Sequence, residues 1–217
     1  MVKKKKEIQK KEDKEMENVS KKQVKNENVI LRNLLLGIGI FVLAIVLFVF
    51  ILGSIRSFDY EGVDFEVVKF CDAEPCLITY QTSVPYIIEG NIVPYNFYIR
   101  NDPRKLKEVT FEGDLHLLSN LVIDSEESFN CDGDGVIAIT NLVTLYDVAL
   151  GVSVLKDENA TCSNSGDYMF LTLKSGNETK IEQTGQACYD IYINDCEILE
   201  GTERFMVETF VEVNKLL

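Results

Sequence analysis

The residues best suited to chemistry in this sequence form a loop of acids, asparagines and glycines ahead of an apolar, helix-like stretch, in FNCDGDGVIAITNLVTLYD from Phe129 to Asp147. A calcium loop supplies oxygens at positions 1, 3, 5, 7, 9 and 12, uses a backbone carbonyl at position 7 and needs glycine at position 6. Counted from Asn130, position 6 is Gly135 and position 8 is the apolar Ile137. The sequence therefore predicts a candidate calcium loop with these ligands: Asn130, Asp132, Asp134, the carbonyl of Val136, and Asn141.

This loop and the helix expected after it resemble half of a dockerin-type calcium motif, with three departures. Asn130 stands where an acid is usual, Ala138 offers no side-chain ligand at position 9, and Asn141 replaces the acid at position 12. Because only Asp132 and Asp134 bring carboxylates, any calcium affinity should fall in the weak range of about 10⁻⁴ to 10⁻³ M. The alternative is a tight turn that caps the helix without a metal, since Asp and Gly suit both roles.

Catalytic signatures are missing from the sequence, which has no G-x-S-x-G, S-x-x-K, H-E-x-x-H or phosphate-binding glycine loop. His116, the single histidine, alternates with apolar residues in DLHLLSNLV, a pattern that favours a strand residue over a general base. The many acids are interpreted as a solvated surface, among them Glu126, Glu127, Glu200, Glu203 and Glu208. We therefore expect no enzyme activity and no cofactor apart from calcium at the loop.

An uninterrupted apolar run lies near the start of the chain, where Leu34 to Leu52 holds 19 residues without a charge. A helix of this length nearly covers a hydrocarbon core of about 30 Å, and a helix that is apolar on every face does not suit the surface of a soluble protein. The sequence predicts a transmembrane helix over 29–55. A signal peptide is disfavoured because the run is long and ends without a small-residue cleavage site; a pilin-like helix is the alternative that stays open.

Charge predicts the orientation of this helix. Residues 1–32 carry 11 basic and 6 acidic side chains, and the remaining residues carry 11 basic and 29 acidic ones. The positive-inside rule then leaves the tail, 1–28, in the cytoplasm and places the domain at 56–217 outside the cell membrane. The tail has too few apolar residues to fold, so we expect it to be disordered and to meet anionic lipid headgroups rather than nucleic acid.

Six cysteines follow the apolar run, at Cys71, Cys76, Cys131, Cys162, Cys188 and Cys196. An even number on the exported side is typical of a disulfide framework, and the absence of C-x2-C pairs disfavours zinc. Six cysteines allow 15 pairings. We prefer Cys71 with Cys76, Cys131 with Cys162, and Cys188 with Cys196. The last pair needs a turn at Asn194 and Asp195, because an extended chain would hold these cysteines about 26 Å apart.

Two sequons support an exterior location. Asn159 in NAT and Asn177 in NET match the N-x-[ST] pattern within polar stretches, so both are candidate N-glycosylation sites. Asn18 in NVS also matches but falls on the predicted cytoplasmic side.

Short segments rich in Val, Ile, Thr, Tyr and Phe predict strands in the exterior domain: FEVVKF, PCLITYQTS, IVPYNFYIR, LKEVTFEG, DYMFLTLK and YDIYIN. Apolar residues from Thr140 to Leu150 recur at helical spacing, and Gly151 suits the cap of that helix before the strand VSVLK. The final stretch, ERFMVETFVEVNKLL, fits two structures: Val207, Thr209, Val211 and Val213 alternate as in a strand, while the glutamates suit a helix, and we favour the strand. The expected fold is α+β: a transmembrane helix, then a mainly β, disulfide-containing domain with one central helix.

Two further stretches, YIRNDPRKL from Tyr98 to Leu106 and CYDIYINDCEILEGTERF from Cys188 to Phe205, resemble uncharacterised single-pass membrane proteins of small-genome, DPANN-type archaea. Pro103 holds Asp102 out of helical geometry, so the first stretch is expected to form a turn between strands. The resemblance implies a short tail, one membrane span and a cysteine-containing exterior domain. It implies a location and no activity.

The expected function is that of a non-enzymatic surface protein, anchored in the lipid bilayer and facing outward. Recognition of an unknown surface or envelope protein, adhesion or envelope structure would suit such a domain. A pilin-like filament subunit is the first alternative, and an extracytoplasmic hydrolase with a site assembled from distant residues is the second.

Overall fold

The computed structural model describes residues 33–49, 56–71, 75–88, 91–155, 159–162 and 166–216. The chain divides into two compact units, Met1–Ser54 and Ile55–Leu217.

In the first unit, residues 33–49 form a helix, and every one of these residues is exposed. Its large apolar side chains are 47% to 67% exposed. Within the described part of the chain, no helix is long and apolar enough to cross a membrane. The ends of the predicted span, 29–32 and 50–55, lie outside the described residues, and so does the whole predicted tail at 1–28.

The second unit contains two sheets. The first is an antiparallel meander of four strands in chain order: β1 (Ser57–Tyr60), β2 (Val63–Phe70), β3 (Leu77–Ile88) and β4 (Asn91–Ile99). Its inner face is apolar because alternate residues such as Val63, Phe65 and Phe97 point to the core, whereas Asp64 and Glu66 point to solvent.

The second sheet has six strands in the order β5-β9-β10-β8-β6-β7. The strands are β5 (Thr110–Glu112), β6 (Asn120–Ser125), β7 (Ser153–Leu155), β8 (Met169–Ser175), β9 (Lys180–Gly185) and β10 (Cys188–Ile193). All neighbouring pairs are parallel except β9 with β10. Its central strand β8 begins with the apolar run Met169–Leu171, and its first five residues are all buried because both faces of that part of the strand are covered, as in most parallel sheets.

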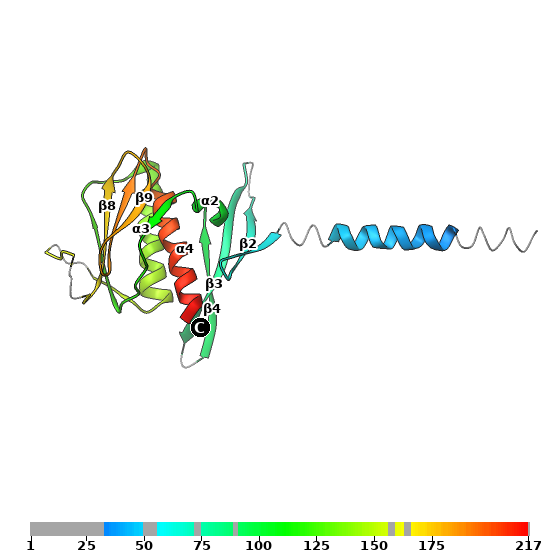
Figure 1. Cartoon of the computed structure of the whole chain (residues 1–217), viewed down its shortest axis with the longest axis horizontal. Helices are drawn as coiled ribbons and strands as arrows, with labels where there is room; N and C mark the ends of the chain where they lie inside the picture. Colours follow the sequence, from blue (N-terminus) through cyan, green and yellow to red (C-terminus); the bar gives the residue numbers. More distant parts are fainter. Residues whose placement is uncertain are drawn as a thin grey trace, which may run out of the picture. The chain divides into compact units, whose positions relative to one another are not determined.

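Helices fill the space between the two sheets (Figure 1). They are α3 (Asp134–Val143), which continues as a π-helical turn over Thr144–Ala149, and α4 (Ile198–Leu216); a short helix, α2 (Pro103–Leu106), links β4 to β5. Phe210 of α4 contacts Phe65 and Phe97 of the four-stranded sheet, while Phe205 of α4 contacts Phe111 and Tyr189 of the six-stranded sheet. One core therefore spans all three layers.

The expected class, a mainly β α+β domain with disulfides and a central helix, is confirmed. The central helix starts at Asp134, earlier than the expected Thr140. Gly151 follows its end with φ +65°, so the expected glycine cap is confirmed.

The predicted C-terminal strand is wrong, since residues 198–216 form α4. This helix lies between two sheets and buries most of its surface. Only a narrow polar stripe marks the helical period, at Glu200, Arg204, Glu208 and Glu212, and the strand-like alternation of the valines outweighed it. The strand expected around His116 is also wrong, because that residue lies in the loop before β6. Three strands, β1, β6 and β9, were not predicted.

Three disulfides link all six cysteines, as expected for a bridged domain, but two of the preferred pairs are wrong. Cys71–Cys76 is confirmed, with the Cα atoms 4.5 Å apart. The other bridges are Cys131–Cys196 and Cys162–Cys188. The reason is that β10 runs extended from Cys188 to Ile193, about 16 Å at 3.3 Å per residue. The turn that follows leads into α4 instead of folding back along β10, so Cys196 meets Cys131 where α3 begins.

Candidate functional site

The candidate calcium loop is a helix start. Cys131, Asp132 and Gly133 all have positive φ, and α3 begins directly afterwards at Asp134. The carboxylate of Asp134 accepts a hydrogen bond from Arg100 Nη1 at 3.0 Å. Asn141 lies seven residues further along the same helix, about 10 Å along its axis.

The remaining features of the loop have packing explanations. The carbonyl of Val136 belongs to the first turn of α3, and a Cβ on Gly135 would lie 1.6 Å from the carbonyl oxygen of Phe129. Glycine at this position therefore follows from the close approach of two chain segments. The structure does not bring the five proposed ligands around one point. Within the described residues, no group of three or more His, Cys, Asp or Glu side chains is placed to hold a metal ion. Calcium binding stays a prediction.

The contacts of His116 hold the loop between β5 and β6 in place. Its backbone N–H donates to the hydroxyl of Tyr189 at 2.7 Å, and that hydroxyl donates to the carbonyl of Asp114 at 3.0 Å. The imidazole Nδ1 lies 3.0 Å from the same carbonyl oxygen. These contacts order the loop against β10.

Glu203 is a buried carboxylate, so its assignment to the solvated surface is wrong. It is 1% exposed on α4 and accepts backbone hydrogen bonds from Arg100 at 2.7 Å and Asn101 at 2.8 Å. Burial raises the pKa of Glu203 to about 7, although these backbone donors act in the opposite direction. A helical interpretation of the C-terminus would have found it, because its neighbours at helical spacing, Leu199 and Met206, are apolar.

Both exterior sequon asparagines, Asn159 and Asn177, are exposed. Asn177 lies in the turn between β8 and β9, and the sequon threonine Thr179 donates to Glu197 Oε2 at 2.5 Å. Exposure leaves room for a glycan at each asparagine.

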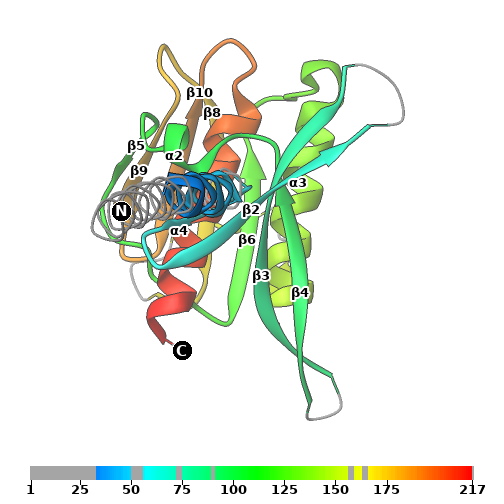
Figure 2. The same cartoon turned by 90° about the vertical axis from the view of Figure 1, so that its right-hand side faces the viewer.

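A cleft interrupts the four-stranded sheet, and it is the strongest candidate site in the described residues. The β2–β3 ladder runs from Phe70 opposite Leu77 to Glu66 opposite Gln81 and ends there. Beyond that pair, β2 follows β1 while β3 follows β4, so the two strands diverge (Figure 2). The space between them is about 630 Å³.

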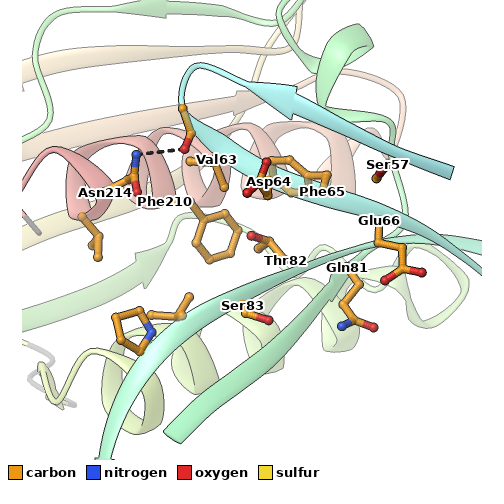
Figure 3. Close-up of a pocket in the computed structure, with 14 residues that line it drawn as sticks. Ser57, Val63, Asp64, Phe65, Glu66, Gln81, Thr82, Ser83, Phe210 and Asn214 are labelled. Atoms are coloured by element: carbon orange, nitrogen blue, oxygen red, sulfur yellow. Dashed lines mark hydrogen bonds between the residues drawn. The ribbon is translucent and has the colours of Figure 1, made fainter. Parts of the chain in front are cut away.

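Helix α4 closes the base of the cleft. Figure 3 shows the ring of Phe210 between the diverging strands. Asn214 Nδ2 donates to the carbonyl of Gly62 at 2.9 Å, which fastens the β1–β2 turn to the same helix. The opening is therefore held by contacts on both sides and is not a frayed sheet end.

The pairing of β3 with β4 indicates which backbone groups face the cleft. In antiparallel strands, facing residues alternate between pairs that exchange two hydrogen bonds and pairs that exchange none. Pro85 faces Pro94, and since neither has an N–H, this is a pair without hydrogen bonds. By alternation, the N–H and C=O groups of Ser83 point away from β4, into the cleft.

The β1–β2 hairpin gives the matching result on the opposite side. Its turn at 61–62 has two residues, both with positive φ, so Tyr60 and Val63 form the hydrogen-bonded pair that closes it. By alternation, the backbone groups of Asp64 and Glu66 point towards β3. Glu66 faces Gln81 in the ladder, but Asp64 faces the cleft.

Three side chains give the cleft its polarity. Asp64 and Glu66 are the charged residues that line it, and neither has an ion-pair partner within the described part of the chain. Thr82 also lines the cleft and is 4% exposed. Among the described residues, nothing hydrogen-bonds to its hydroxyl. The cleft thus combines open backbone groups, two negative charges and one hydroxyl that has no hydrogen-bond partner within the described residues.

No protein-family model, curated protein or solved structure matches this chain. Its function therefore has to be argued from its own residues.

Proposed function

We propose that this chain is a membrane-anchored surface protein whose outward-facing domain recognises another molecule. The single observation that carries the proposal is that all six cysteines follow the apolar helix and all are paired. Disulfides persist in oxidising compartments outside the cytosol.

The first unit supports an anchor. The helix at 33–49 has no charged side chain, and its large apolar side chains are at least 47% exposed. Apolar surface of this extent favours a lipid environment. The net charge is +5 before residue 33 (11 basic, 6 acidic) and −18 from there on (11 basic, 29 acidic), which favours a cytoplasmic start and an exported end.

Recognition is the function we favour over catalysis because the described residues that line the cleft offer groups suited to hydrogen bonding, charge pairing and apolar contact. Its lining includes backbone edges, two carboxylates, hydroxyls, amides and apolar side chains such as Phe210 and Val213. We include N-linked glycans at Asn159 and Asn177 in the proposal, since both are exposed. A glycosidase that lowers the apparent mass, with no change for the Asn159→Gln, Asn177→Gln variant, would support that part.

The test of the proposed function is the topology of the full chain in intact cells. A lysine reagent that cannot cross membranes should label Lys69 and Lys105 but none of the lysines before residue 33. Thiols trapped with acid and alkylated after denaturation should number zero, and six after reduction. Labelling of the N-terminal lysines, or six free thiols before reduction, would overturn the proposal. A mature chain lacking the lysine-rich start would favour the pilin-like alternative.

A further inference from the structure

We infer that the cleft between β2 and β3 binds a short extended peptide segment, with a Lys or Arg side chain, from a partner protein. This inference deepens the proposed recognition function and rests on it for the location of the partner. The class of ligand follows from three independent features of the cleft.

The first feature is the backbone. Ser83 on β3 and Asp64 on β2 would form the next hydrogen-bonded pair of the ladder, but the strands diverge before they meet. Unpaired N–H and C=O groups at a strand edge are the template on which extended peptides bind by strand addition. A small molecule without alternating donors and acceptors would satisfy these groups less completely.

The length of the segment is limited by Pro85. It faces the same edge as Ser83 but has no N–H, so the ladder that a peptide forms with β3 loses a donor there. A volume of about 630 Å³ lies within the usual range for ligand sites, about 300 to 1,000 Å³. The cleft therefore suits a few residues in extended conformation rather than a long strand.

The second feature is charge. On the outer face of the six-stranded sheet, acids are paired: Asp190 lies 3.0 Å from Lys174 Nζ, and Glu182 pairs with Lys180. Asp64 and Glu66 have no such partner in the described residues, and no Lys, Arg or His is among the described residues that line the cleft. A basic side chain from the peptide would supply the missing charge.

The third feature is Thr82, which is 4% exposed. Within the described residues, no fully buried side-chain nitrogen or oxygen lacks a hydrogen bond, so the hydroxyl of Thr82, which has no protein partner, is reached by solvent from the cleft. The hydroxyl of Thr82 lies on the core side of the cleft, beside Phe210 (Figure 3). A peptide that enters the cleft displaces this solvent and can give the hydroxyl a hydrogen-bond partner of its own.

The experiment measures peptide binding to the full chain in detergent micelles by fluorescence anisotropy. The probe is labelled Thr-Val-Lys-Val-Lys-Val-Thr. The controls are the same peptide with Glu for Lys and one with N-methylated backbone amides, which cannot form a strand ladder. The basic peptide should bind at least about tenfold more tightly than either control at low ionic strength.

The protein variants locate the binding. Asp64→Asn with Glu66→Gln should weaken binding about tenfold, while the matched pair Glu108→Gln with Glu112→Gln, which lies outside the cleft, should leave it unchanged. Thr82→Val should weaken binding about fivefold without lowering the melting temperature, because the hydroxyl has no partner to lose. That combination separates a ligand contact from a structural role.

Equal binding of the basic and acidic peptides, indifference to the cleft variants, or no binding at millimolar peptide would overturn the inference. A dimer of the full chain that Thr82→Val dissociates would assign the cleft to a second copy and overturn it too. None of these results affects the topology test. An inward-facing domain that still bound the basic peptide would leave the cleft inference standing and overturn the proposed surface function.

Discussion

The two sheets of the folded domain share one helical layer but differ in how completely their strands are paired. In the six-stranded sheet, β8 and β10 each have a partner strand on both sides, and Met169, Leu171 and Ile191 are each 0% exposed. In the four-stranded sheet, the ladder between β2 and β3 stops at Glu66 and leaves a cleft.

The exposed apolar residues differ in the same way. Phe70, Leu77, Ile78 and Tyr98 of the four-stranded sheet are 38% to 49% exposed. In the six-stranded sheet, the outer face around Phe170 is covered by a small cluster with Val122, Cys188 and Ala160. The six-stranded sheet is therefore the more completely paired and covered of the two, whereas the four-stranded sheet presents unpaired strand edges and apolar side chains to solvent.

Breaking the disulfides should give the largest effect and should distinguish the two regions. Cys131–Cys196 closes 65 residues and ties the starts of α3 and α4, while Cys71–Cys76 closes only 5 in the four-stranded sheet. The loop-entropy relation predicts losses of about 4 kcal/mol and about 2 kcal/mol in the free energy of unfolding. Urea unfolding of the two double Cys→Ala variants measures the difference. Equal losses would show that Cys131–Cys196, which joins the starts of α3 and α4, stabilises the fold no more than Cys71–Cys76 does.

Glu203 joins the two regions, since it sits on α4 and holds the backbone at Arg100 and Asn101, where β4 ends. Its pKa is raised from 4.5 to about 7 in the folded state. The folded state therefore favours the protonated acid. The stabilisation that protonated Glu203 contributes is complete below about pH 4.5 and is lost as the pH rises to about 7. The free energy of unfolding should fall by about 3 kcal/mol over this range, at 1.36 kcal/mol per pH unit.

Urea unfolding from pH 4 to pH 8 measures that loss. Glu203→Gln should flatten this part of the profile, whereas Glu178→Gln, at an exposed position, should keep it. A Glu203→Gln profile as steep as that of the unaltered chain would show that another group titrates.

Tyr146 should give the smallest effect. Its hydroxyl lies 2.6 Å from the hydroxyl of Thr209, which donates its own hydrogen to the carbonyl of Phe205, so Tyr146 is the donor. Tyr146→Phe removes this bond between the π-helical turn and α4 and should cost about 1 kcal/mol. Thermal unfolding compares it with Tyr98→Phe, which changes an exposed hydroxyl and should cost less than about 0.5 kcal/mol. A loss for Tyr146→Phe no greater than that of Tyr98→Phe would show that the hydrogen bond between Tyr146 and Thr209 does not contribute to stability.

Much of the fold was predictable where one sheet face meets the core. The alternation in FEVVKF and IVPYNFYIR predicts β2 and β4, and the glycine after the central helix marks its end. Strand β9 was not predicted because Lys180, Glu182 and Gln183 surround a single large buried residue, Ile181. It pairs with the adjacent β10 on one side, but on the other side it pairs with β5, which is about 70 residues away in sequence.

Little of the candidate site was predictable. The cleft depends on where a ladder ends, and the sequences around Asp64 and Ser83 read as ordinary strand. The disulfide pairing failed because it depends on the direction of β10 and on α4, which the sequence suggested was a strand. In the candidate calcium motif, the glycine at Gly135 has a packing reason in its close approach to Phe129.

Hydrogen–deuterium exchange of the full chain in detergent micelles, read at single amides, tests the contrast between the open and the closed sheet most directly. The amides of Asp64 and Ser83 should exchange quickly, while those of Leu171 and Ile191 should be protected by their position in fully paired strands. If the amides of Asp64 and Ser83 are protected as strongly as those of Leu171 and Ile191, the cleft is closed in solution. That result would contradict the claim that the cleft is the binding site of a recognition domain.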